Sequence, residues 1–452
     1  MNLVYGIKDK PKFGQLIVFA FQQLLAILAA TIAVPAIVGN GMSQSAALFG
    51  AGVGTIIYLL FTKFRSPVFL GSSFAFLGSM FAAFAGAVST EAGYAGIIIG
   101  AIFAGLVYVV IAIIVKIAGV AWINKLMPAV VIGPTVAIIG LSLAGNAVGD
   151  ALHFAANEGG AYVMDAHAWV GFICALVTLF VVMICSVFGK KMARLIPFII
   201  GIVAGYAVAA CFTLIGTKTG NEALMIIDFS LFQNMQWIPD FTFLTAAKGL
   251  SAVDGKYIAT IAVAYVPVAF VVFAEHIADH KNLSSVIGQD LLEDPGLHRT
   301  LLGDGVGSMV GAIFGGCPNT TYGESVGCVA ITGNASVVTI LTTAILAIVI
   351  SFFGPFVTFL ATIPSCVMGG VCITLYGFIA VSGLKMLQKV DLGQNKNLFV
   401  ASVILIAGIG GMTLKIGQVT ITEIAAALIL GIITNLILSR KKDDAEEEVA
   451  AA

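Results

Sequence analysis

The sequence predicts an all-α polytopic membrane protein, and its composition is the first reason. Of the 452 residues, 60% are hydrophobic and only 10% are charged, and the mean hydropathy is +1.07. A soluble domain carries about 25% charged residues, so 22 basic and 23 acidic side chains cannot cover a water-facing surface for a chain of this length. The composition therefore excludes a soluble protein. The net charge of −1 also excludes a basic surface for nucleic acid.

The second reason is the spacing of the apolar segments. A membrane-spanning helix needs about 20 mostly apolar residues, and the chain contains fourteen candidate spans, of which the third and tenth are short or irregular. In order, they lie near residues 15–36, 46–62, 67–86, 94–116, 122–146, 168–188, 195–216, 257–280, 300–316, 320–333, 335–353, 367–387, 398–413 and 419–438. We therefore expect a multi-pass protein of the lipid bilayer.

The basic residues test this layout. With the N-terminus in the cytoplasm, 18 of the 22 lysines and arginines fall in inner segments. The four outer ones are Lys218, Lys248, Lys256 and Lys415, three of which share one long loop. The positive-inside rule thus predicts an even number of spans with both termini cytoplasmic. Residues 1–14 then form a cytoplasmic N-terminus and residues 440–452 a cytoplasmic tail.

The chain also divides into two halves of seven spans at the polar stretch 218–256, which we expect to be an extracytoplasmic linker. Because seven is odd, the second half starts from the opposite side of the membrane, which makes an inverted repeat. Irregular segments, 72–76 (SSFAF) and 319–323 (NTTYG), interrupt corresponding spans of the two halves. Matched broken spans predict a substrate site near the membrane midplane. The alternative is that both are ordinary helix kinks.

Two acidic residues close the apolar run of the eighth span. Glu275 and Asp279 are one helical turn apart and lie on one face of the helix. Like charges repel and burial penalises each charge, so we expect at least one of them to be neutral near pH 7 and able to exchange a proton. His276 and His280 face elsewhere and are weaker candidates. The alternative is that residues 275–281 form a solvated cap at the end of the span.

A third acid, Glu324, lies in the segment GGCPNTTYGESVG without a basic neighbour. Residues 318–321 (PNTT) favour extended chain over helix. Tyr322, Gly323 and Glu324 are then predicted to open a half-helix whose free N–H groups point at a ligand. The alternative is a surface acid on an outer loop.

One class of solute suits these side chains. A planar, uncharged heterocycle with N–H donors and C=O acceptors along its edge would be held by the carboxylates and by N–H groups at the end of a helix. Aromatic rings would sandwich it, with Phe74, Phe76, Tyr322 and Tyr376 as the candidates.

These segments together resemble the nucleobase–ascorbate transporter family, and most closely its bacterial uracil permeases, which are uracil:proton symporters. The resemblance covers nearly the whole chain and rests on five motifs in the family's order: LGSSFAF (70–76), AEHIADH (274–280), DLLEDPGLHR (290–299), PNTTYGESVGCVAITG (318–333) and IPSCVMGGVCITLYG (363–377).

The resemblance implies two inverted seven-span repeats with short strands in the broken spans 3 and 10. It implies a core domain, residues 15–117 and 257–354, and a gate domain, residues 118–217 and 355–439. It also implies import by alternating access across the bacterial cytoplasmic (inner) membrane, with the proton as coupling ion and no other cofactor. A homodimer is left open.

The resemblance implies roles for individual residues as well. Glu275 and Glu324 would bind the pyrimidine edge, and Tyr322 and Gly323 would line the broken tenth span. The Phe74 backbone would close the site, and Tyr376 would approach from the gate. Proton coupling would fall on Glu275, Asp279 and Glu324.

The chain departs from the family pattern at three places. Asp279 stands where uracil-type members often have a second histidine, and Ser325 stands where an asparagine usually follows the glutamate. Thr332-Gly333 is closer to the purine-type T-G than to the T-R of uracil types. Uracil is favoured, and xanthine or another oxopurine remains an alternative.

Other classes of protein fit the sequence less well. An anion transporter of the same fold would need a basic residue at its site rather than two acids. A membrane enzyme would need a motif such as HExxH or a cofactor signature, and neither is present. The seven cysteines show no CxxC spacing, so we expect no metal site.

Overall fold

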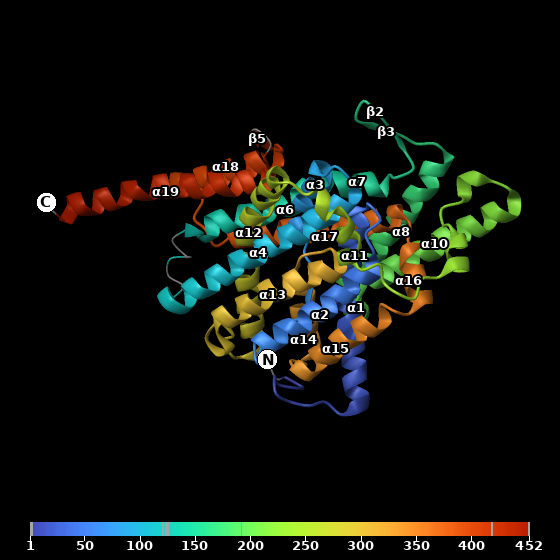
Figure 1. The fold of residues 1–452 in the computed structure, drawn as a ribbon, viewed down its shortest axis with the longest axis horizontal. Coiled ribbons are helices and arrows are strands. Elements are labelled where there is room, and N and C mark those ends of the chain that lie inside the picture. Colours follow the sequence, from blue (N-terminus) through green and yellow to red (C-terminus); the bar gives the residue numbers. More distant parts are fainter. Residues whose placement is uncertain (1–2, 120–121, 123–125, 191, 417–418, 451–452) are drawn as a thin grey trace.

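The computed structural model describes residues 3–119, 122, 126–190, 192–416 and 419–450. In Figure 1, the chain is coloured from blue at its N-terminus to red at its C-terminus, and the elements of the first half and the linker come first. The elements are α1 (Phe13–Val38), α2 (Gln44–Phe61), β1 (Leu70–Ser72), η1 (Phe74–Phe76), α3 (Leu77–Gly86), α4 (Thr90–Ala118), α6 (Ala129–Ser142), α7 (Ala144–Ala151), β2 (Ala156–Glu158), β3 (Ala161–Val163), α8 (Ala166–Phe188), α9 (Met192–Leu195), α10 (Pro197–Thr219), η2 (Glu222–Leu224), η3 (Phe229–Asn234), α11 (Thr242–Gly249) and η4 (Leu250–Ala252).

The second half repeats this pattern of helices around one short buried strand. Its elements are α12 (Gly255–Ile287), η5 (Leu292–Gly296), α13 (Leu297–Gly315), β4 (Asn319–Thr321), α14 (Gly323–Thr332), α15 (Val337–Ile350), α16 (Gly354–Ala361), α17 (Ser365–Leu387), α18 (Asn395–Ile409), β5 (Leu414–Ile416), β6 (Val419–Ile421) and α19 (Glu423–Ala450).

Each of the fourteen predicted spans contains a described helix. In the described part of the chain, eight helices are long and apolar enough to cross a membrane, and α15 with α16 forms a further span that bends by 82° at its break. Three shorter apolar helices lie in the third, thirteenth and fourteenth segments, and α13 and α14 complete the set. The expected multi-pass helical fold is confirmed. Residues 123–125, at the start of the predicted fifth span, and residues 451–452 of the predicted tail lie outside the described residues.

The helices pack in two groups. In the first group, α13 packs against α2 and α4, α12 packs against α4, and α15 packs against α1 and α2. In the second group, α17 packs against α6, α7 and α8, α10 packs against α8, and α18 packs against α6 and α19. Each packing group contains helices from both halves of the chain, as expected for an inverted repeat. The exact domain boundaries given above stay a prediction.

Strands β1 and β4 cross in the buried centre, where the two broken spans meet. They pair antiparallel, with Leu70 opposite Thr321 and Ser72 opposite Asn319, and every residue of both strands is buried. The Ser73 N–H donates to the Pro318 carbonyl at 2.9 Å, and the Tyr322 N–H donates to the Phe69 carbonyl at 3.2 Å. Pairing of the two breaks satisfies backbone groups that lipid would leave without partners. The predicted strands in spans 3 and 10 are thus confirmed.

A glycine permits this close crossing. A Cβ atom at Gly71 would lie 2.3 Å from two ring carbons of Tyr322, which packs across the strand. We expect Gly71→Ala to destabilise the protein by about 1–3 kcal/mol, because the rigid ring must move. A lower thermal unfolding midpoint would show this. Gly377→Ala in α17 is the control, since no atom lies within 4 Å of its added Cβ, and an equal effect at both positions would contradict the steric explanation.

The N-terminal segment lies along the turn between α14 and α15. The Val4 N–H donates to the Gly333 carbonyl at 2.8 Å, and the Ala335 N–H donates to the Tyr5 carbonyl at 2.9 Å. Figure 1 shows the N-terminus beside α14. The N-terminus and the far end of α14 therefore share one face of the molecule, which we call the N-terminal face.

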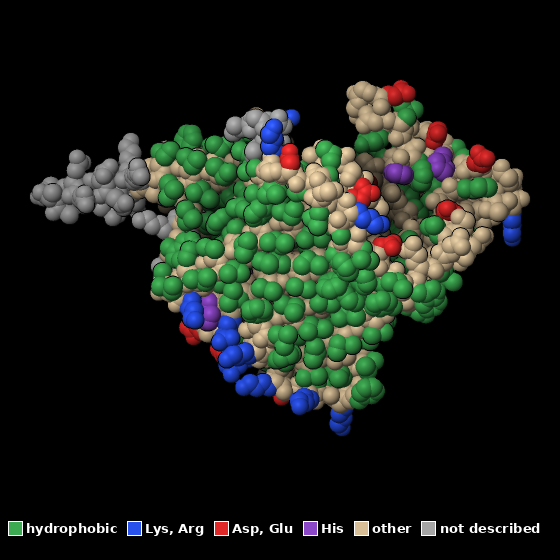
Figure 2. All heavy atoms as spheres, viewed as in Figure 1, with side chains coloured by type: hydrophobic (Ala, Val, Ile, Leu, Met, Phe, Trp, Pro, Cys, Tyr) green, Lys and Arg blue, Asp and Glu red, His purple; other side chains and the backbone are tan. Residues whose placement is uncertain are grey.

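The surface matches a protein that is surrounded by lipid. Figure 2 shows a broad field of hydrophobic side chains, with lysines and arginines gathered along the lower left edge and most visible acids and histidines toward the upper right. Large apolar side chains such as Phe13, Ile117 and Phe188 are more than two-thirds exposed. In water this would be unfavourable, so the apolar field is the part that contacts the bilayer.

Candidate functional site

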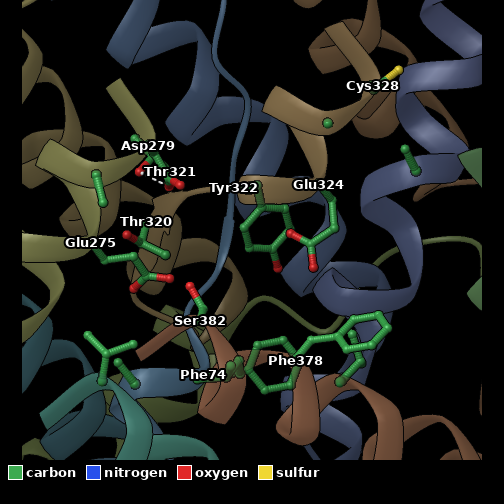
Figure 3. A pocket seen from close by; sticks show the side chains of 18 of the residues that line it. Phe74, Glu275, Asp279, Thr320, Thr321, Tyr322, Glu324, Cys328, Phe378 and Ser382 are labelled. Carbon is green, nitrogen blue, oxygen red and sulfur yellow. Dashed lines mark hydrogen bonds between the residues drawn. The ribbon is translucent and has the colours of Figure 1, made fainter. Parts of the chain in front are cut away.

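A cavity of about 410 Å³ lies where the broken spans meet the second group of helices. Its volume is in the range of small-molecule sites. One wall comes from α12, β4 and α14, and the opposite wall comes from α6, α10 and α17. The cavity therefore lies between the two packing groups, with residues from both halves of the chain. Figure 3 shows it from close by.

Three acidic side chains line this cavity. Glu275 and Asp279 come from the same face of α12, and Glu324 comes from the first turn of α14. In Figure 3, Glu275 and Glu324 enter from two sides with Tyr322 between them. Among the described residues, none of the three forms an ion pair. The structure thus brings together the acids that the sequence predicted, and it places residue 275 at a cavity rather than in a solvated cap.

The local structure around Asp279 and Glu324 favours an acid at each position. The Thr321 hydroxyl of β4 donates to Asp279 Oδ2 at 2.8 Å, the dashed line in Figure 3. Glu324 lies in the first turn of α14, where the helix dipole favours negative charge. Each acid therefore keeps acceptor capacity that a ligand can use.

Tyr322 is fixed by the first broken span. Its hydroxyl donates to the Ser72 carbonyl of β1 at 2.8 Å, and the Thr31 hydroxyl of α1 lies 3.5 Å away. The ring lines the cavity, and the next residue, Gly323, begins α14. The half-helix predicted to start at residues 322–324 is therefore present, and its first residues, Gly323 and Glu324, line the cavity.

The aromatic candidates divide into two sets. Phe74 lines the cavity, and Tyr376 packs edge-on against it with ring centroids 5.9 Å apart. Tyr376 is absent from the described lining residues. Phe76 turns away from the cavity and stacks on Tyr265 at 5.5 Å. Of the rings predicted to sandwich a ligand, Phe74 and Tyr322 are in place, and Tyr376 supports Phe74 from behind.

Sequence reasoning missed several lining residues on α17 and β4. The α17 face toward the cavity consists of Leu375, Phe378, Ile379, Ser382 and Met386, which follow helical periodicity and leave Tyr376 on a neighbouring face. Thr320 of β4 also lines the cavity; it is 3% exposed, and its hydroxyl has no partner in the described part of the chain. A buried hydroxyl without a partner is a hydrogen-bonding group that a ligand can satisfy.

A separate polar network lies on the other side of α12. His276 Nδ1 lies 2.8 Å from Asp304 Oδ2 of α13, and its Nε2 lies 2.9 Å from the Thr300 hydroxyl. His280 Nε2 lies 2.7 Å from the Tyr58 hydroxyl of α2. Both histidines are fully buried and neither lines the cavity. The network holds α12 so that the neighbouring residues, Glu275 and Asp279, face the cavity.

Ser325, one of the departures from the family pattern, also lies behind the site. Its hydroxyl accepts from Gln23 Nε2 of α1 at 2.5 Å and from the Phe69 N–H at 3.1 Å. It therefore ties α14 to α1 and to the segment before β1, and it is absent from the described lining residues. Within the described residues there is also no group of three His, Cys, Asp or Glu side chains placed to hold a metal ion.

A helical membrane fold with a cavity between two groups of helices, lined by apolar residues and three acids, is the arrangement expected of a membrane transporter. The chain belongs to the Permease family (Xan_ur_permease), whose model matches residues 14–417. The family expected from the motifs is thereby confirmed, and the chain is a transporter rather than an enzyme.

Known relatives cover almost the whole chain. The chain is 42% identical over 448 residues to the uracil permease of Bacillus caldolyticus, and the alignment covers 98% of this chain and 96% of that relative. It is 38% identical over 445 residues to the uracil permease of Bacillus subtilis, covering 97% and 96%. It is 34% identical over 434 residues to the uracil permease of Escherichia coli K12, covering 96% and 93%.

Solved structures support the fold. The transmembrane domain of the cyanobacterial bicarbonate transporter BicA superposes with a TM-score of 0.61 at 16% identity, covering 95% of this chain and 100% of that one. The murine anion transporter Slc26a9, in an inward-facing state, gives a TM-score of 0.65 at 11% identity, covering 96% of this chain and 69% of that one. At these identities the likeness shows the shared inverted-repeat architecture alone.

Proposed function

We propose that this protein is a proton-coupled secondary transporter that imports a nucleobase, with uracil as the favoured substrate, by alternating access. The observation that carries the proposal is the placement of Glu275 and Glu324, from two different helices of one cavity wall, around one cavity with the start of α14 beside it. The names of the relatives, which are uracil permeases, support the same substrate.

The chemistry of the cavity matches a pyrimidine edge. Uracil has N–H groups that can donate hydrogen bonds to the carboxylates. It also has C=O groups that can accept hydrogen bonds from the Thr320 hydroxyl and from the N–H groups at the start of α14. Phe74 and Phe378 line the apolar part of the cavity for the ring faces. Charge-assisted hydrogen bonds in a buried site are stronger than neutral ones, so the two glutamates dominate recognition.

A ligand-dependent melting screen tests the substrate. Uracil, thymine, xanthine, uric acid and guanine are added separately to the purified protein, and a ligand that binds only the folded state raises the unfolding midpoint. We expect the largest rise with uracil. A larger rise with xanthine or guanine would replace uracil by an oxopurine, the alternative that Thr332-Gly333 leaves open.

The orientation of the protein is part of the proposal. The positive-inside count puts the N-terminal face in the cytoplasm, and the first and second packing groups act as the core and the gate. Substrate then enters from the opposite face, binds between the groups, and leaves toward the N-terminal face when the core moves against the gate. Proton coupling falls on Glu275, Asp279 and Glu324, all of which line the cavity.

Asp279 is the residue that we expect to set the pH dependence. In Asp279→Asn, the amide oxygen still accepts the Thr321 hydroxyl, but the side chain can no longer take up a proton. We expect the affinity for uracil to change by less than about threefold, and the dependence of initial uptake rate on external pH to flatten between about pH 5 and pH 8. Asp240→Asn, at an exposed position on the linker, is the control. An unaltered pH profile in Asp279→Asn would contradict its role in coupling.

A further inference from the structure

Arg194 is a basic residue at the cavity that the proposed function does not use. It lies on the short helix α9, between α8 and α10 of the second packing group, and its side chain is exposed. Of the described residues that line the cavity, it is the only lysine or arginine. The described part of the chain shows no ion pair for it. A free guanidinium therefore shares one cavity with three carboxyl groups.

The path from Arg194 to Glu324 follows one face of α14. Glu324, Gly327, Cys328 and Ile331 all line the cavity, at the spacing of a single helix face. This face runs from buried residues near the strands to Ile331, which is 49% exposed close to the N-terminal face. The cavity lining therefore extends along this face of α14 from Glu324 toward the N-terminal face, and we call this stretch the exit route.

The segment that carries Arg194 touches this route. α9 packs against α14 and α1, and Ile196, two residues after Arg194, packs against Cys328 and Ala26. Cys328 is one turn beyond Glu324, a rise of about 6 Å. An extended arginine side chain is longer than one helical turn, so a guanidinium at this position has the length to span the distance from the level of Cys328 to Glu324.

We propose that Arg194 is a release residue: once the core is open to the N-terminal face, its guanidinium competes with the nucleobase for the Glu324 carboxylate. A guanidinium presents its N–H donors as a planar fork that fits a carboxylate. It can thus replace the N–H donors of the base, and the carboxylate is not left buried without a partner when the base leaves. This inference rests on the proposed function, because it assumes that the base binds Glu324.

If the Arg194 guanidinium competes with the base for Glu324, its removal has an effect that a merely structural role would not have. Loss of the guanidinium should strengthen binding and slow turnover, because the base keeps Glu324 for longer. We expect Arg194→Gln to bind uracil about fivefold more tightly and to lower the maximal uptake rate in proteoliposomes by a similar factor. Arg194→Lys keeps the charge but loses the planar fork, so both values should lie between those of the wild type and those of Arg194→Gln.

Two further variants make the test decisive. Lys190→Gln removes an exposed cation four residues away that does not line the cavity, and both values should remain unchanged. Arg194→Met keeps an apolar stem without the charge, and it replaces the glutamine variant if that variant does not yield folded protein. Binding is measured with radiolabelled uracil at equilibrium, and uptake is measured under an imposed pH gradient.

The outcomes separate this inference from the proposed function. Tighter binding together with slower uptake in Arg194→Gln, with smaller changes of the same sign in Arg194→Lys, supports a release residue. Weaker binding together with slower uptake, or no change in either value, overturns it. If the wild type binds and transports no nucleobase at all, the proposed function fails, and the release role of Arg194 fails with it because it requires a base bound at Glu324.

Discussion

Glu324→Gln is expected to weaken uracil binding by at least about thirtyfold, which corresponds to roughly 2 kcal/mol for the loss of a charge-assisted hydrogen bond. The amide has the same shape as the carboxylate but offers the substrate a weaker acceptor. It also places an N–H₂ group beside the free N–H groups at the start of α14. Equilibrium binding of radiolabelled uracil to the purified variant measures the loss.

The control for this variant is Glu293→Gln. Glu293 is an exposed acid of η5, outside the cavity, and carries the same chemical change. It should bind uracil as the wild type does. If Glu324→Gln retained wild-type affinity while folding normally, the carboxylate would not contact the substrate, and the binding mode proposed above would be wrong.

The largest loss of stability is expected in the network behind α12. His276 and Asp304 are both 0% exposed and lie within 2.8 Å of each other. His276→Leu would leave the Asp304 carboxyl buried without this partner, and its Oδ1 atom already lacks a partner in the described structure. Breaking one side of such a buried pair costs about 3–5 kcal/mol. A clear drop in the thermal unfolding midpoint is therefore expected.

The double variant distinguishes a broken pair from a packing defect. His276→Leu with Asp304→Leu replaces both partners by apolar groups, which often costs little or nothing, so most of the lost stability should return. His153→Leu, at an exposed histidine, is the control and should leave the midpoint unchanged. A double variant that is no more stable than His276→Leu alone would show that the pair is not the source of the loss.

The sequence carried enough information to place the two breaks and the acids. Pro318, Thr320 and Thr321 disfavour helix, and Gly323 starts a new one, so strand β4 and helix α14 follow from local chemistry. The scarcity of charge marked Glu275, Asp279 and Glu324 as unusual, since an acid in an apolar segment needs a reason to be there. The family motifs then related these positions to a substrate.

The rest of the cavity depends on how helices rotate against each other. Helical periodicity groups Leu375, Phe378 and Ser382 on one face of α17. The sequence does not indicate that this face, rather than the face that carries Tyr376, lines the cavity. From the sequence alone, Arg194 is one of the basic residues that mark the cytoplasmic side. Its proximity to the Glu324 face depends on the packing of α9 against α14. The 82° bend after α15 was also not predicted, because apolar residues continue through it.

Uptake of radiolabelled uracil into proteoliposomes tests the central claim most directly. The purified protein is reconstituted, and the external medium is made acidic relative to the lumen. The account predicts accumulation of uracil above the external concentration, its collapse when an uncoupler dissipates the pH gradient, and no accumulation with Glu324→Gln. Uptake no greater than in empty liposomes would contradict the uracil assignment, and accumulation that persists with the uncoupler would contradict proton coupling.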